Sequence, residues 1–209
     1  MNLYVDFDDT LVNSSDVVVD ILNKRYKMRM DCKGYRKYNF TDLFPKLTKE
    51  ELKEIFESDE FFNSLKIYED CLSTLLSFYS KTKQPTTFVT HGTDINLYKK
   101  EKYLDISPIE FQYTFIGLSN EKDKNEFSNF KSKKSVDMKN GIFIDDNIKN
   151  LKESNASIKI LFKDWKEKEC NKLEPNSDIY VLNSWYEINE FISFILRNNR
   201  ESADIWQTF

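Results

Sequence analysis

Two pairs of acidic residues stand at the ends of short apolar runs in this chain. Asp6 and Asp8 follow an apolar run near the N-terminus, and Asp145 and Asp146 follow another at 141–144. Because side chains alternate along a strand, Asp6 and Asp8 would leave the first strand on the same side. Carboxylates so close together repel unless a cation or a shared proton relieves them. Magnesium prefers such oxygen ligands, so the spacing predicts a magnesium site.

The same residues, with two others, match what phosphate-ester hydrolysis requires. One carboxylate can attack phosphorus and carry the phosphoryl group, while a second carboxyl group protonates the leaving oxygen. Thr90 ends another apolar run, and Lys134 precedes the run that ends in Asp145. A hydroxyl and an ammonium group can hold phosphoryl oxygens as charge develops. Lys131 and Lys133 lie in the same short lysine run and remain alternatives to Lys134.

The elements that position these residues alternate along the chain. Apolar runs predict strands at 3–7, 86–90, 111–116, 141–145, 158–162 and 178–182. Helical patterns occur at 14–29, 48–58, 69–80, 94–103, from 147 onward and at 184–197. Thr48 and Ser184 are the expected N-caps of two of these helices, and 59–65 is expected to form a turn. The alternation predicts an α/β fold with a parallel sheet. Residues 10–85 exceed what one crossover needs, so they are predicted to contain an inserted helical subdomain.

Composition restricts the classes of partner. The chain has 209 residues, a net charge of -4 and 40% hydrophobic residues, which indicates a globular protein without an extended nucleic-acid surface. We expect no membrane contact, because no run approaches ~20 apolar residues, and we expect a cytoplasmic protein. The three cysteines, Cys32, Cys71 and Cys170, are widely spaced and are expected to be reduced. Association into a homodimer stays open.

Four segments together carry a family resemblance. Residues 6–10 (DFDDT) resemble motif I of the haloacid dehalogenase superfamily, whose pattern is DxDx[TV] after an apolar strand. Residues 88–90 (FVT) resemble motif II, Lys134 fits motif III, and residues 144–146 (IDD) fit motif IV. The four occur in the order of that family. The resemblance implies a Rossmann-like, three-layer α/β/α core and a phosphatase.

The resemblance also implies a role for each residue. Asp6 would be the nucleophile and Asp8 the general acid and base, while Thr90 and Lys134 would bind the transferring phosphoryl group. Magnesium, the implied cofactor, would be held by the Asp6 carboxylate, the Asp8 backbone carbonyl and the carboxylate that follows strand 141–145. That last ligand is Asp146, with Asp145 supporting it through water or a hydrogen bond.

The long insertion resembles the type 1 cap of the same superfamily. It would make residues 14–82 a helical cap and residues 1–13 and 83–209 the catalytic core. Residues 56–65 are similar to a cap segment of the 5'(3')-deoxyribonucleotidases, and 184–188 to their last helix. Cap aromatics of that family stack on the nucleobase, so Phe61 or Phe62 would line a base pocket. The implied substrate is a small phosphomonoester, a nucleoside monophosphate.

The two residues that follow Thr90 are further candidates for contact with substrate. His91 and Gly92 follow it directly, although His91 fits an ordinary turn residue equally well. They stand where the nucleotidases have Ser and Pro. Two other functions remain open: a phosphatase for a sugar phosphate or other small phosphomonoester, and a non-catalytic nucleotide-binding module on the same fold.

Overall fold

The core of the molecule is a six-stranded parallel sheet. The computed structural model describes residues 1–30, 40–119, 132–162 and 177–206, with the side chains of 199–206 left out. Its strands are β1 (Asn2–Val5), β2 (Thr86–Gly92), β3 (Tyr113–Ser119), β4 (Gly141–Asp145), β5 (Ile158–Phe162) and β6 (Ile179–Leu182). They lie in the order β3-β2-β1-β4-β5-β6, and every neighbouring pair is parallel. This confirms the predicted α/β fold with a parallel sheet.

In the described part of the chain, helices occupy much of the sequence between and after the strands. They are α1 (Ser14–Tyr26), α2 (Phe40–Leu43), α3 (Lys49–Glu57), α4 (Asp59–Ser64), α5 (Cys71–Thr82), α6 (Asp94–Ile106), α7 (Ile148–Glu153) and α9 (Trp185–Trp206), with one 3-10 turn, η1 (Lys133–Ser135). Five of them, α1 to α5, fall between β1 and β2. No described helix is long and apolar enough to cross a membrane.

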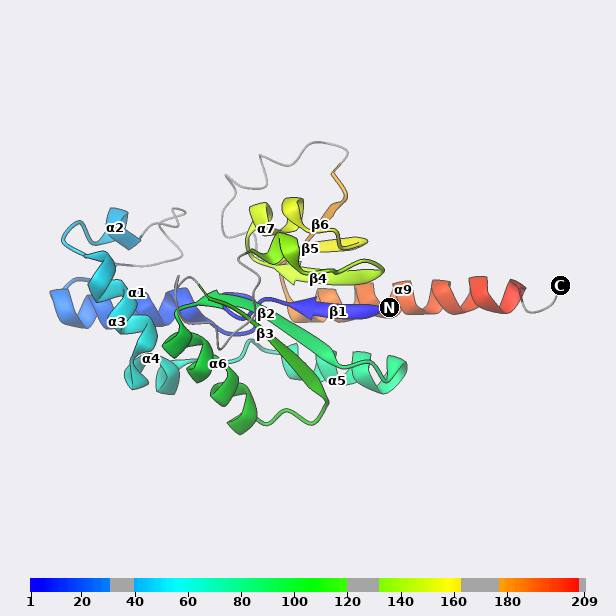
Figure 1. Cartoon of the computed structure of the whole chain (residues 1–209), viewed down its shortest axis with the longest axis horizontal. Helices are drawn as coiled ribbons and strands as arrows, with labels where there is room; N and C mark the ends of the chain where they lie inside the picture. Colours follow the sequence, from blue (N-terminus) through cyan, green and yellow to red (C-terminus); the bar gives the residue numbers. More distant parts are fainter. Residues whose placement is uncertain (31–39, 120–131, 163–176, 207–209) are drawn as a thin grey trace.

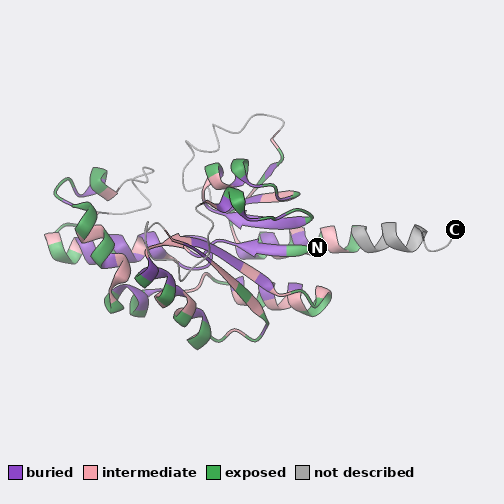
Figure 2. Ribbon diagram, in the orientation of Figure 1, coloured by how far each residue is buried: buried purple, intermediate pink, exposed green. Residues whose placement is uncertain are grey.

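The sheet is buried on both faces, which gives three layers (Figures 1 and 2). Helices α5 and α9 pack against each other, and their buried residues join those of the sheet face that carries Leu3 and Val5. Helix α7 packs on β4 and β5, where its buried residues join the opposite face, which carries Phe143. Parallel sheets require such cover on both sides, so the strands β1, β4 and β5 are mostly apolar. Leu3, Val5 and Phe143 are fully buried.

Strand β1 lies in the middle of the sheet, between β2 and β4. Val5 is in register with Phe88 on one side and Ile144 on the other. The residues that follow Val5, Phe88 and Ile144 therefore emerge at one edge of the sheet. In open α/β sheets this carboxyl edge is where binding sites form.

The helices α1, α3 and α4 extend beyond that edge of the sheet (Figure 1). Thr48 caps α3 as predicted, because its hydroxyl accepts a hydrogen bond from the N–H of Glu51 at 3.1 Å. Arg25 of α1 pairs with Glu51 at 2.8 Å and ties α1 to α3. A second cap starts α4, where the Ser58 hydroxyl accepts from the N–H of Phe61 at 3.1 Å. This cap explains why 59–64 forms a helix and not the predicted turn.

Other features also differ from the prediction. Strand β3 runs over Tyr113–Ser119, later than the predicted 111–116, because it pairs along the whole of β2. Helix α9 continues to Trp206 and does not end near residue 197. Helix α5 falls within the predicted cap range 14–82, yet it packs against α9 beside the sheet. The predicted division into cap and core stays a prediction.

Candidate active site

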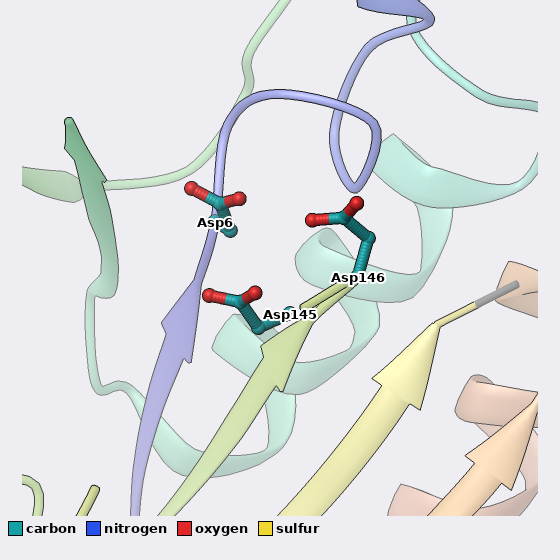
Figure 3. A group of neighbouring side chains, drawn as sticks. All are labelled: Asp6, Asp145 and Asp146. Carbon is teal, nitrogen blue, oxygen red and sulfur yellow. The ribbon is translucent and has the colours of Figure 1, made fainter. Parts of the chain in front are cut away.

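Three carboxylates converge at the carboxyl edge of β1 and β4. Asp6 follows β1, Asp145 ends β4, and Asp146 comes next, with their side chains directed toward one another (Figure 3). Each offers one oxygen, and these oxygens all lie within 4.8 Å of one another. All three residues are buried. The backbone N–H of Asp6 donates to the Ile144 carbonyl at 3.0 Å, which extends the β1–β4 pairing to the first of these carboxylates.

A buried lysine lies between two of them, and it is not the predicted one. The ammonium nitrogen of Lys133 lies 2.6 Å from Asp6 Oδ1 and 2.8 Å from Asp145 Oδ2. Lys134, the predicted residue, is exposed, and Lys133 is the residue that contacts the two carboxylates. The reason is the 3-10 turn η1, which directs adjacent side chains differently and sends only Lys133 inward. The third candidate, Lys131, lies outside the described residues.

The electrostatics of this pair follow from burial. Burial raises the pKa of Asp6 from 3.8 to about 7; the positive charge of Lys133 opposes the rise, and the negative charges of Asp145 and Asp8 add to it. Burial alone would lower the pKa of Lys133, but the carboxylates of Asp145 and Asp6 outweigh it and raise that pKa. Lys133 therefore stays charged, while Asp6 needs more positive charge nearby to stay ionised at neutral pH.

Asp145 is held by hydrogen bonds from the segment that follows it. The N–H of Asn147 donates to Asp145 Oδ1 at 2.8 Å, and the side-chain amide of Asn150 lies 3.1 Å from both carboxylate oxygens. Asn147 also caps α7 by accepting from the N–H of Lys149. With Lys133 on Oδ2, both oxygens of this fully buried carboxylate are engaged. Asp145 is therefore positioned to orient Lys133.

Asp8 and Thr90 meet at a second buried lysine. Lys100 of α6 is 1% exposed, and its ammonium donates to Asp8 Oδ2, to Thr90 Oγ1 at 2.8 Å and to the His91 carbonyl at 2.8 Å. The other oxygen of Asp8 accepts from the Ser14 hydroxyl at 2.6 Å. Asp8 and Thr90 are far apart in the sequence, but both side chains contact the ammonium group of Lys100.

His91 and Gly92 complete the end of β2. Burial, with the positive charges of Lys133 and Lys100, lowers the pKa of His91 from 6.5 to about 4, so its imidazole is neutral at neutral pH. Gly92 faces the side chain of Asn96, and a Cβ at this position would collide with the Asn96 amide oxygen. Packing against α6 therefore accounts for this glycine without a substrate.

Phe61 and Phe62, the predicted base-stacking residues, are both buried on α4. Phe61 is 0% and Phe62 9% exposed, and their rings meet edge to face with centroids 5.2 Å apart. Phe56 packs on Phe61 in the same way at 5.1 Å. Their exposure does not single out either ring as the one that faces a cleft.

Three contributors to the site were missed from sequence. Lys100 lies in a lysine-rich helix, where lysines are normally solvated, so nothing local marks it. Ser14 lies eight residues after Asp6, at the start of α1, where a serine is common and does not mark a site. Asn150 could have been found from sequence, because it follows Asp146 by four residues. It therefore lies in the first turn of the helix that starts directly after the acidic pair.

Comparisons with known proteins place the fold. No protein-family model matches the chain, and no curated sequence matches it either. Among solved structures, a haloacid dehalogenase-like protein from Streptococcus pneumoniae superposes with a TM-score of 0.61 at 14% identity, covering 91% of this chain and 97% of that one. The chain has the haloacid dehalogenase fold. This confirms the Rossmann-like three-layer core that the four motif resemblances implied.

Two further structures support the same assignment of fold. A superfamily hydrolase from Ehrlichia chaffeensis has a TM-score of 0.53 at 13% identity, covering 93% of this chain and 97% of that one. The haloacid dehalogenase-type protein YfnB from Bacillus subtilis, solved with magnesium bound, has 0.51 at 12%, covering 91% and 97%. None of the three is described as a nucleotidase, so these structures do not support the resemblance to the 5'(3')-deoxyribonucleotidases.

The acidic cluster fits a magnesium ion by its chemistry. Its three carboxylates are hard oxygen donors of the kind that magnesium binds. Lys133 pairs with two of them, Asp6 and Asp145. A divalent cation beside these carboxylates would favour the charged form of Asp6.

Proposed function

We propose that this protein is a magnesium-dependent phosphomonoesterase that works through an aspartyl-phosphate on Asp6. The observation that carries the proposal is the convergence of Asp6, Asp145, Asp146 and Lys133 at the carboxyl edge of the sheet. A nucleophilic carboxylate, an ammonium group and oxygen ligands for a hard cation are the parts that phosphoryl transfer from a monoester requires. The haloacid dehalogenase fold is consistent with this chemistry.

In the first step, an Asp6 carboxylate oxygen attacks phosphorus. The bond from phosphorus to the ester oxygen breaks, its electron pair stays on that oxygen, and Asp8 supplies the proton that makes it an alcohol. In the second step, a water gives a proton to Asp8 and attacks the same phosphorus. The bond to Asp6 then breaks, which releases phosphate and restores the carboxylate.

The transferring group would be held by Lys133 and Thr90. An ammonium group has three N–H donors, and the described carboxylate partners of Lys133 take two of them, so one can reach a phosphoryl oxygen. The Thr90 hydroxyl donates only a long hydrogen bond of 3.4 Å to the His91 carbonyl, so its proton can turn to a better acceptor. Both groups are buried, where such contacts gain strength from the low dielectric.

Asp6, Asp146 and the backbone carbonyl of Asp8 would hold the magnesium ion, with Asp145 in support. Bound there, the ion would neutralise negative charge on the phosphoryl oxygens and on the attacking carboxylate. Asp145 would act by orientation, since hydrogen bonds from Asn150, Asn147 and Lys133 already engage its oxygens.

Two substrate classes are supported by different observations. The similarity of residues 56–65 to a nucleotidase cap segment favours nucleoside monophosphates. The burial of Phe61 and Phe62 within an aromatic cluster that includes Phe56 favours a small phosphomonoester without a base, such as a sugar phosphate. In both cases helices α1, α3 and α4 would form the cap that covers the substrate.

The decisive experiment measures phosphate release from a panel of nucleoside monophosphates, sugar phosphates and p-nitrophenyl phosphate, with magnesium and with excess chelator. The proposal expects magnesium-dependent release and, after rapid acid quench, the mass of one phosphoryl group on the peptide that contains Asp6. The Asp6→Asn variant should release nothing and carry no added mass. A wild-type protein that hydrolyses none of the panel, yet binds nucleotides, would instead favour the non-catalytic module.

A further inference from the structure

Lys100 is a fully buried cation near the site, and none of the four motif resemblances includes it. It lies on α6, ten residues after Thr90, and 1% of its surface is exposed. Its ammonium group contacts three oxygens, from Asp8, Thr90 and the His91 backbone, and lies 5.3 Å from the centre of the Phe7 ring. Burying an ammonium group costs free energy unless each contact is well made. A hydrophobic side chain at this position of α6 could be buried at a lower cost in free energy. The buried charge therefore suggests a role other than packing.

The number of donors separates Lys100 from Lys133. An ammonium group has three N–H donors, and Lys100 has an oxygen partner for each. It therefore has no donor left for a phosphoryl oxygen. Lys133 has two described carboxylate partners and one donor to spare. The two lysines of the site are thus suited to different tasks.

We infer that Lys100 is a positioning residue, which sets the orientation of the Asp8 carboxylate and the Thr90 hydroxyl together. The inference rests on the proposed function. On Asp8, Lys100 holds Oδ2 while the Ser14 hydroxyl holds Oδ1, so the plane of the carboxylate is fixed from both sides. Each oxygen keeps a second lone pair, which can carry the proton to and from the reacting oxygen.

The effect on Thr90 comes through the same ammonium group. A hydroxyl has one donor and two acceptor lone pairs, and Lys100 occupies one lone pair at 2.8 Å. The hydroxyl proton must therefore point away from Lys100. Its described acceptor, the His91 carbonyl, is 3.4 Å away, so the proton is available to a phosphoryl oxygen. The ammonium group of Lys100 thus orients both the carboxylate of Asp8, which carries the proton, and the hydroxyl of Thr90, which binds the phosphoryl group.

The competing explanation is that Lys100 only neutralises Asp8 and fastens α6 to the sheet. The two explanations differ in which substrates suffer when the ammonium group is removed. An alkyl phosphate has a poor leaving group and needs the proton from Asp8, whereas p-nitrophenyl phosphate has a good leaving group and does not. Loss of a purely structural contact would slow both substrates alike.

The experiment compares Lys100→Met with wild type on p-nitrophenyl phosphate and on glycerol phosphate. The inference expects kcat/KM to fall by about 100-fold or more for the alkyl ester and by less than about 10-fold for the aryl ester, since general acid catalysis contributes factors of this size. The ratio kcat/KM is the proper quantity because it reports the steps up to the phosphoenzyme. Lys102→Met is the matched control, an exposed lysine on the same helix, and should leave both values unchanged.

A double-mutant cycle with Asp8→Asn protects the test against a folding defect. The double variant buries neither member of the ion pair alone, so it should fold even if Lys100→Met is unstable. If Lys100 acts on proton transfer through Asp8, adding Lys100→Met to Asp8→Asn should lower kcat/KM for glycerol phosphate only by the smaller factor, less than about 10-fold, that acts through Thr90. Independent multiplication of the two losses would overturn the inference.

The outcomes also separate this inference from the proposed function. An active wild type whose Lys100→Met variant loses both substrates equally, or neither, would overturn the role of Lys100 alone. A wild type that hydrolyses no phosphomonoester would overturn the proposed function and the inference with it. Thermal unfolding of each variant shows whether the proteins compared are folded.

Discussion

Lys133 places its ammonium nitrogen 2.6 Å from Oδ1 of Asp6, the proposed nucleophile. The contact joins a loop that precedes β4 to the end of β1, across more than a hundred residues of sequence. It holds one carboxylate oxygen of Asp6 in place, and it supplies positive charge where phosphoryl transfer needs it. The relationship also identifies which of two adjacent lysines serves the site, and that assignment can be tested directly.

Replacing Lys133 by Met should reduce kcat by about 100- to 1,000-fold, the usual loss when one such donor is removed. The matched change Lys134→Met should leave kcat near wild type, because that side chain is exposed. Steady-state phosphatase kinetics on both variants, with circular dichroism to confirm folding, provide the measurement. Equal losses in the two variants would contradict the assignment.

Magnesium should stabilise the folded protein through the acidic cluster. A ligand at 100 times its Kd adds about 2.7 kcal/mol, and for a chain of this size we expect a rise in Tm of about 5–10 °C. Asp146→Asn removes one proposed ligand and should abolish most of the rise. Asp20→Asn, an exposed carboxylate on α1, is the control and should keep it.

Differential scanning fluorimetry with and without magnesium measures this shift without any need for substrate. Potassium at matched ionic strength controls for general screening of charge. A wild-type Tm that magnesium does not change would remove the metal from the proposed site.

Acidification should destabilise the protein through His91. Its pKa in the folded protein is about 4 against an ordinary 6.5, so the unfolded chain binds a proton at pH values where the folded one does not. The contribution of His91 to the free energy of unfolding is complete above pH 6.5. It is lost as the pH falls toward 4. Because the ring is partly exposed, we expect an effect on the order of 1 kcal/mol between pH 7.5 and 5.

Urea unfolding of wild type and His91→Gln at the two pH values gives the measurement. The variant cannot take up this proton, so its stability should fall less between pH 7.5 and 5 than that of wild type. An identical pH dependence in both proteins would show that His91 titrates normally in the folded state.

Contacts between α6 and the end of α3 should control how firmly the proposed cap is held. The Asn96 amide donates to the Phe56 carbonyl at 2.6 Å, and Lys99 donates to the Glu57 carbonyl at 2.7 Å and to Asp59 at 2.6 Å. The Asn96→Ala change removes one of these hydrogen bonds, at a cost of about 1 kcal/mol. We expect KM to rise and hydrogen–deuterium exchange of residues 49–64 to become faster.

Lys53→Met is the matched control for this cap contact. Lys53 lies 3.7 Å from Glu57 but is largely exposed, so its loss should alter neither KM nor exchange. Unchanged exchange in Asn96→Ala would show that the α6 contacts do not hold these helices.

Much of the fold could be predicted because its signals are local. The apolar runs of β1 and β4 mark buried strands, and Thr48 marks the start of α3 by a cap that needs only its own neighbours. The end of β3 was misplaced because its partner β2, distant in the chain, decides how far pairing runs. Helix α4 was missed because its cap, Ser58, follows directly on the end of α3.

The site divides in the same way between local and distant information. The convergence of Asp6, Asp145 and Asp146 could be predicted from local patterns, because acidic residues at the ends of parallel strands emerge at one edge of a sheet. Which lysines lie beside these carboxylates depends on long-range packing. Lys133 and Lys100 both stand in lysine-rich segments, and a lysine becomes buried only where distant carboxylates meet its ammonium group. Such a meeting depends on how helices and loops pack across the sheet, and no short stretch of sequence records it.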